Sequence, residues 1–83
     1  MKILYFSWIK DKVGKSEEYI DLDTEINNVN RLITFLKQRN SIYDEVFKDT
    51  SSIRVSINME TAKLDDKIKQ GDEIAFFPPM TGG

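Results

Sequence analysis

The order of apolar and polar side chains predicts a β-hairpin at the start of this chain. Residues 2–9 (KILYFSWI) are β-branched and aromatic, which is typical of a strand. Residues 17–22 (EEYIDL) are predicted to form a second strand with Ile20 and Leu22 on one face. Residues 11–14 supply the turn, so we expect the two strands to pair as a hairpin.

The period then changes to that of a helix. Apolar side chains recur at i, i+3, i+4 and i+7 over residues 29–36, which is the spacing of one helical face. Asn27 or Asn28 can cap the first turn, and we expect the helix to run to about Arg39. Residues 41–44 (SIYD) predict a second, short helical turn with a serine cap.

Two more strands are predicted after the helix. Residues 53–58 (IRVSIN) alternate apolar and polar side chains, as in a strand that is buried on one face. Leu64 and Ile68 anchor a polar connection, and its turn at 69–72 contains a glycine at a position that favours positive φ. Residues 73–77 (EIAFF) form the last strand, because the two prolines that follow cannot donate to a sheet ladder.

This order of elements indicates one α+β domain, with strands gathered around one main helix. A chain of 83 residues has material for a single modest core, with about 60% of the unfolded surface buried. We therefore divide the chain into a folded domain, residues 1–77, and an extended tail, residues 78–83.

A single helix covers only one face of the sheet, yet both faces are predicted to be apolar. In the first strand Leu4, Phe6 and Trp8 share the face that the helix does not cover, and Phe77 joins them from the last strand. Contiguous exposed apolar surface on a small protein usually marks an interaction site. The alternative is a loop folded over this face.

The composition excludes several kinds of site. The chain has no cysteine and no histidine, which excludes disulfides, thiolate nucleophiles, imidazole bases and zinc sites that need these residues. Twelve basic and fourteen acidic residues give a formal charge of −2 without a basic stripe, which argues against nucleic acid binding. The first residues predict a strand rather than a signal peptide, and no stretch has the length of a membrane span. We expect a cytoplasmic protein that binds neither membrane nor metal.

The last residues carry the candidate chemistry. Gly82 and Gly83 have no side chains, so this segment can pass through a narrow channel and present its carboxylate without steric hindrance. Pro78 and Pro79 favour an extended exit from the domain. At about 3.3 Å per residue, residues 78–83 could reach on the order of 20 Å into another protein.

The closing sequence GDEIAFFPPMTGG resembles that of the small subunit of molybdopterin synthase, a family of ubiquitin-like β-grasp sulfur carriers. The similarity includes ILYFSWIKDKVG at the start and the asparagine that ends VSIN, and it covers nearly the whole chain. It implies a β-grasp fold, a mixed sheet of four to five strands with the main helix packed on one face. Lys10 stands where the family usually has arginine, so the charge is retained but a bidentate contact is not.

The resemblance also implies a reaction. An ATP-dependent adenylating enzyme of the ubiquitin-activating type converts the Gly83 carboxylate into an acyl-adenylate, and a sulfur donor protein supplies the sulfur of a C-terminal thiocarboxylate. The tail then donates this sulfur, inside the large catalytic subunit, to cyclic pyranopterin monophosphate. The product is the dithiolene of molybdopterin. The chain acts as the sulfur-donating subunit of a sulfurtransferase that holds two copies of each chain, and it binds no cofactor itself.

Gly83 and Gly82 are the reactive residues that this resemblance implies. The predicted partner-binding residues are Leu4, Phe6, Trp8, Lys10, Phe77, Pro78, Pro79, Met80 and Thr81.

Other functions fit the same pattern. A ubiquitin-like carrier of another sulfur pathway, such as thiamine synthesis or tRNA thiolation, uses the same Gly83 chemistry with a different partner, and so does a protein modifier. A non-catalytic interaction module uses the exposed apolar face and does not need the tail. A stand-alone enzyme needs paired carboxylates, but the acidic pairs of this chain lie in predicted turns, where solvated charges are typical.

Overall fold

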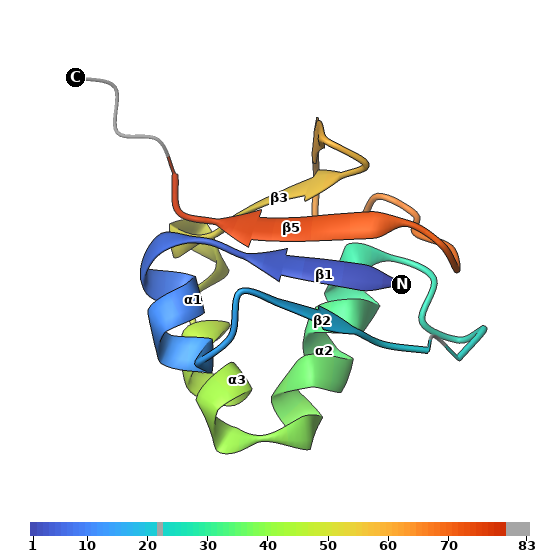
Figure 1. The fold of residues 1–83 in the computed structure, drawn as a ribbon. Helices are drawn as coiled ribbons and strands as arrows, with labels where there is room; N and C mark the ends of the chain where they lie inside the picture. The colour runs from blue at the N-terminus through green and yellow to red at the C-terminus, as the bar shows by residue number, and fades with distance from the viewer. Residues whose placement is uncertain (22, 80–83) are drawn as a thin grey trace.

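The computed structural model describes residues 1–21 and 23–79. In chain order its elements are β1 (Lys2–Tyr5), α1 (Ser7–Val13), β2 (Glu17–Tyr19), α2 (Val29–Arg39), α3 (Ser41–Val46), the 3₁₀ helix η1 (Thr50–Ser52), β3 (Arg54–Ile57), β4 (Glu60–Ala62) and β5 (Glu73–Phe77). The strands form one mixed sheet in the order β2-β1-β5-β3-β4, in which β1 and β5 are parallel and the other neighbours antiparallel. The α-helices lie on one side of this sheet, which confirms the predicted α+β class (Figure 1).

The first strand is shorter than predicted, and the strand prediction for residues 6–9 is wrong. β1 ends at Tyr5, and Ser7 has a φ of 58°, which turns the chain out of the sheet and into α1. Ile9 of α1 is fully buried in the core, and Gly14 ends the helix with a φ of 85°. A short apolar run does not distinguish a strand from a buried helix, so the periodicity alone could not reveal this change.

The two later helices begin with asparagine caps. The side chain of Asn28 accepts a hydrogen bond from the N–H of Arg31 at 2.8 Å, and α2 extends to Arg39 as predicted. The serine cap predicted for the next helix is wrong. There the side chain of Asn40 accepts from the N–H of Ile42 at 2.9 Å, so one asparagine ends α2 and starts α3.

The sheet differs from the prediction at both edges. β2 has only three residues, and Leu22 of its predicted extension lies outside the described residues. β4 falls in the segment predicted as a polar connection, after a turn in which Asn58 and Met59 both have positive φ. Gly71 has a φ of 94°, which confirms the positive φ expected in the turn before β5.

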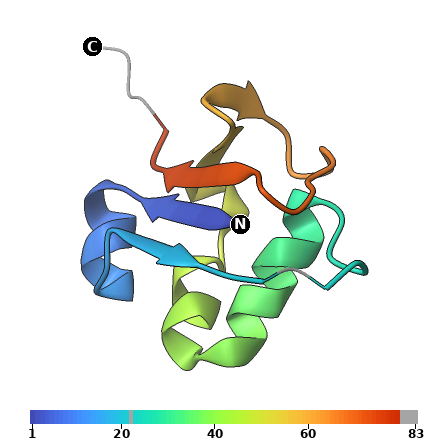
Figure 2. The same ribbon diagram turned by 45° about the vertical axis from the view of Figure 1, so that its right-hand side comes forward.

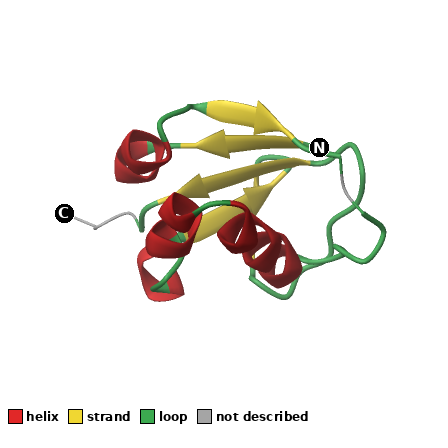
Figure 3. Ribbon diagram, turned by 90° about the horizontal axis from the view of Figure 1, so that it is seen from below, coloured by secondary structure: helices red, strands yellow, loops and turns green. Residues whose placement is uncertain are grey.

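The core lies between the inner face of the sheet and the helices (Figure 3). The rings of Phe47 and Phe76 meet there edge to face, with their centroids 4.9 Å apart. The largest fully buried side chains are Tyr5, Phe47, Phe76, Ile3, Ile9, Leu32, Leu36, Ile74 and Val29. These residues come from the sheet and from α1, α2 and the segment after α3, so one continuous core holds the described elements together.

Candidate functional site

The sheet face away from the helices, here called the outer face, carries the predicted apolar patch. Side chains alternate along a strand, so the buried Ile3 and Tyr5 place Leu4 on the outer face. The pairing of Leu4 with Ala75 brings β5 into the same row. Leu4 and Ala75 thus form an apolar centre on this side of the sheet, and Leu4 is half-buried. The α-helices lie on the other side, so no helix covers this centre (Figure 1).

The aromatic end of this face lies where β5 leaves the sheet. The N–H of Phe6 donates to the carbonyl of Phe76 at 3.1 Å, which extends the β1–β5 pairing by one residue and sets Phe6 beside Phe77. Phe6 is 48% exposed and Phe77 is half-buried. Leu4, Phe6 and Phe77 share this face, as predicted, and we call these three residues the outer-face patch.

Pro78 and Pro79 follow the patch directly, and both are half-buried. α1 and the C-terminal end of β5 lie at the same end of the molecule (Figure 2). The outer-face patch and the start of the predicted tail are therefore neighbours. Met80, Thr81, Gly82 and Gly83 lie outside the described residues, and their predicted roles stay predictions.

Trp8 does not extend the outer-face patch, contrary to the strand prediction. It lies on α1, where it is half-buried and packs against the core. Lys10, predicted as a partner-binding residue, also lies on α1 and is exposed. The turn at Ser7 separates Trp8 from the strand face on which it was predicted, and the partner-binding role of Lys10 stays a prediction.

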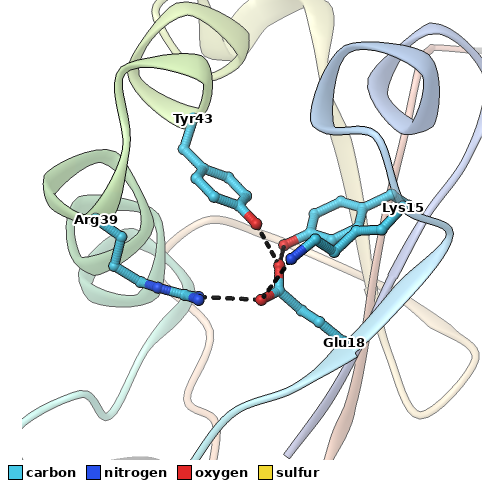
Figure 4. A network of polar contacts seen from close by, with 5 residues as sticks. Lys15, Glu18, Arg39 and Tyr43 are labelled. Carbon is cyan, nitrogen blue, oxygen red and sulfur yellow. Dashed lines mark hydrogen bonds and ion pairs between the residues drawn. The ribbon is translucent and has the colours of Figure 1, made fainter.

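A polar cluster on the opposite, inner side of β2 was missed by the sequence analysis (Figure 4). One carboxylate oxygen of Glu18, Oε2, accepts hydrogen bonds from the hydroxyls of Tyr5 and Tyr43, each at 2.6 Å. The other, Oε1, accepts from Arg39 at 3.1 Å and lies 3.8 Å from the ammonium of Lys15. The cluster links β2 to β1, α2 and α3. Its signal in the sequence was Tyr5, a tyrosine at a core position whose hydroxyl needs a partner.

The pKa values in this cluster are shifted in opposite directions. Burial alone raises the pKa of Glu18, but the hydrogen bonds from Tyr43, Tyr5 and Arg39 outweigh burial and lower it. Burial and the adjacent Glu18 carboxylate raise the pKa of Tyr43 to about 12. Burial, and then Glu18, raise the pKa of Tyr5 far above its ordinary value. At neutral pH the carboxylate is charged and both phenols are protonated, which is the state in which these hydrogen bonds are strongest.

Metal-binding clusters and membrane-spanning helices are both absent from the described residues. Within residues 1–21 and 23–79 there is no cluster of three acidic side chains that could hold a metal ion. The helices in the described part of the chain lack the length and apolar character of a membrane span. The described residues therefore present one partly exposed apolar face, and Pro78 and Pro79 follow directly from it.

Comparison with known proteins gives a family. Residues 3–83 match the model of the ThiS family. A molybdopterin synthase sulfur carrier subunit from Dictyostelium discoideum is 34% identical, and the match covers 99% of this chain and 94% of that protein. Two solved structures are also similar, and each match covers 95% of this chain and 95% of the other chain. One is a candidate molybdopterin converting factor subunit 1 from Pyrococcus furiosus, with a TM-score of 0.75 and 30% identity. The other is small archaeal modifier protein 1 from Haloferax volcanii, with a TM-score of 0.77 and 25% identity. The chain therefore belongs to the ThiS family and has the ubiquitin-like β-grasp fold of these sulfur carriers.

Proposed function

We propose that this chain is the sulfur carrier subunit of a molybdopterin synthase. The observation that carries the proposal is the near end-to-end match to a relative of that name, in a family whose model also covers residues 3–83. The matched range includes the proline pair, Gly82 and Gly83. The match is nearly complete in both chains, which supports the same role for this chain.

The proposed chemistry takes place at the carboxylate of Gly83. A carboxylate is a poor electrophile, so a ubiquitin-activating-type enzyme first joins it to AMP from ATP and releases pyrophosphate. Sulfur from a donor protein then takes the place of AMP on the same carbonyl carbon. Each thiocarboxylate donates one sulfur to cyclic pyranopterin monophosphate, and the Gly83 carboxylate is regenerated. The molybdopterin dithiolene has two sulfurs, so two charged chains are used for each product. The ATP is consumed on the activating enzyme, and this chain binds no cofactor of its own.

The described residues of this chain serve docking. The outer-face patch buries its apolar surface against the large catalytic subunit, which receives the tail in its active site. Pro78 and Pro79 follow β5 directly and favour an extended exit from the domain. The groups that move protons during sulfur transfer belong to the large subunit, whose active site encloses the reacting thiocarboxylate. The matched relative and the Pyrococcus protein are both named as subunits, which supports such an assembly.

The structural match to small archaeal modifier protein 1 favours a second candidate function, that of a protein modifier. A modifier uses the same acyl-adenylate of Gly83, but the acceptor is an amine of another protein in place of sulfur. Both functions need the diglycine, and they differ in the product that the activated carboxylate forms.

Reconstituted synthesis tests the proposal. The purified chain is combined with the large subunit and adenylating enzyme from the same genome, a sulfur donor, ATP and the pyranopterin precursor, and molybdopterin is measured. We expect product with the wild-type chain, strongly reduced product with Gly82→Ala, and none when Gly83 is deleted. Full activity of the Gly83-deleted chain contradicts the proposal, and covalent conjugates without molybdopterin favour the modifier.

A further inference from the structure

Among the described residues, four large hydrophobic side chains are exposed, and two of them lie on the outer face of the sheet. These two are Phe6 and Tyr19, which are 48% and 73% exposed. Of the other two, Met59 lies in the turn between β3 and β4, and Ile42 lies on α3. Tyr19 is on the outer face because its strand neighbour Glu18 points inward to the cluster of tyrosines. Tyr19 is not among the partner-binding residues predicted from the sequence.

Tyr19 continues the outer-face patch toward the other end of the sheet. In the β1–β2 pairing Tyr19 lies opposite Lys2, and Glu17 lies opposite Leu4. Leu4 is therefore the diagonal neighbour of Tyr19, at a spacing of roughly 7–8 Å that an aromatic side chain can bridge. The surface thus runs from Tyr19 through Leu4 to Phe6, along about 13 Å of strand at about 3.3 Å per residue.

Charged neighbours surround this aromatic ring. The ammonium of Lys2 lies 5.9 Å from the centroid of the Tyr19 ring and 3.3 Å from the carboxylate of Glu17. Glu73 of β5 flanks Lys2 on the other side. One cation and two carboxylates leave this part of the face with a net charge of −1. A complementary partner surface therefore offers an apolar pocket for the ring and a basic side chain at its rim.

The backbone on both sides of Tyr19 is held firmly. On one side, Glu18 is fixed by Tyr5, Tyr43 and Arg39. On the other side, the N–H of Ile20 donates to the carbonyl of Met1 at 2.9 Å. An aromatic side chain on a rigid strand loses little conformational entropy when it is bound, which is the property of an interface anchor.

We infer that Tyr19 is a second anchor for the large subunit, at the opposite end of the outer face from the tail. The inference rests on the proposed function and deepens it. Contacts at Phe6 and Phe77 alone leave the domain able to pivot about the point where the chain leaves the sheet. A further contact at Tyr19 fixes the angle of the sheet against the partner, and hence the direction in which Pro78 and Pro79 point.

Calorimetric titration against the large subunit from the same genome tests this inference. Tyr19→Ala is expected to raise the Kd roughly tenfold or more, mainly through faster dissociation. Tyr19→Phe keeps the ring and is expected to stay within about threefold of wild type. Tyr19→Glu is a second variant, which can pair with Lys2 in the folded chain, and it should weaken binding at least as much as Tyr19→Ala. Since Tyr19 is exposed, all three variants should melt close to the wild-type temperature.

Matched variants separate failure of this inference from failure of the proposed function. Met59→Ala removes a side chain that is 86% exposed and lies in the turn after β3, three strands away from β2 in the sheet order, so it should leave the Kd unchanged. The inference is overturned if Tyr19→Ala binds within about twofold of wild type, or if Met59→Ala weakens binding equally. In either case normal binding by the wild-type chain and weak binding by Phe77→Ala leave the proposed function standing. A wild-type chain that does not bind the large subunit at all overturns both.

Discussion

The N–H of Phe6 donates to the carbonyl of Phe76 at 3.1 Å, although the two aromatic side chains belong to opposite faces of the sheet. Phe76 is fully buried against Phe47 on the inner face, whereas Phe6 is 48% exposed on the outer face. One backbone contact therefore joins the core to the outer-face patch. It also sets Phe6 beside Phe77, the last residue of the sheet before the proline pair.

These two phenylalanines should respond differently to the same truncation. Phe76→Ala leaves a cavity in the core and is expected to lower the free energy of unfolding by about 3–5 kcal/mol. Phe6→Ala should lower the free energy of unfolding by less than about 1 kcal/mol, because the Phe6 ring is exposed in the isolated chain. The same substitution should weaken binding to the large subunit, because the ring is buried in the proposed interface. Urea unfolding and calorimetric titration measure the two effects. A large loss of stability in Phe6→Ala with unchanged binding would mean that the outer face is not the docking face.

The turn at Ser7 is expected to be strained. A residue with a side chain at φ of 58° costs about 1–2 kcal/mol relative to the right-handed region, and glycine does not bear this cost. Ser7→Gly should therefore raise the free energy of unfolding by up to about 1 kcal/mol, after allowance for the greater freedom of glycine in the unfolded chain.

Gly14→Ala is the matched control for Ser7→Gly. A Cβ at Gly14 meets no atom within 4 Å, so the substitution changes only the backbone preference at a φ of 85°. It should lower the free energy of unfolding by about 1 kcal/mol. The midpoint temperature of thermal unfolding should therefore rise for Ser7→Gly and fall for Gly14→Ala. A destabilised Ser7→Gly would show that the serine side chain itself stabilises the turn.

The Glu18 cluster should contribute stability that depends on pH. The pKa of Glu18 is lower in the folded chain than its ordinary value of 4.5, so its contribution is fully present above that pH. The contribution is lost as the pH falls through the folded-state pKa. For Tyr43 the pH dependence of the contribution has the opposite direction. Its pKa rises from 10.0 to about 12, so its contribution is present below pH 10 and is lost as the pH approaches 12.

Glu18→Gln tests this dependence. At neutral pH it should lower the free energy of unfolding by about 1–3 kcal/mol, because Arg39 and two hydroxyls lose a charged acceptor. The difference in free energy of unfolding between the variant and the wild type should become smaller as the pH falls below 4.5. Glu45→Gln, which removes an exposed partner of Lys12 at 3.3 Å, is the control and should cost less than about 1 kcal/mol. If the difference in free energy of unfolding between Glu18→Gln and wild type stays constant through the acid range, the lowered pKa does not belong to Glu18.

The parts of the fold with a strong local period could be predicted from the sequence. α2 carries its apolar residues at helical spacing and has an asparagine cap, and β5 combines β-branched and aromatic residues with a proline stop. α1 could not be predicted, because it depends on a positive φ at Ser7 that serine does not signal. β4 is a three-residue edge strand of mostly exposed residues, too short to show a period.

The candidate site divides in the same way. The placement of Leu4, Phe6 and Phe77 on one face followed from strand alternation and is confirmed by the β1–β5 register. The Glu18 cluster could not be predicted, because its partners Tyr5, Arg39 and Tyr43 are 13, 21 and 25 residues away along the chain. Such contacts arise only when the sheet and the helices are packed together.

The intact mass of the chain tests the central claim most directly. The full chain is coexpressed with the adenylating enzyme from the same genome and a sulfur donor, then purified and measured by mass spectrometry beside a Gly83-deleted control. The account predicts a wild-type species heavier by the difference between one sulfur and one oxygen atom, with fragmentation that places the change on Gly83. It predicts no such species for the control. An unchanged wild-type mass, with an adenylating enzyme shown to release pyrophosphate in the presence of the chain, would contradict the claim that Gly83 carries sulfur.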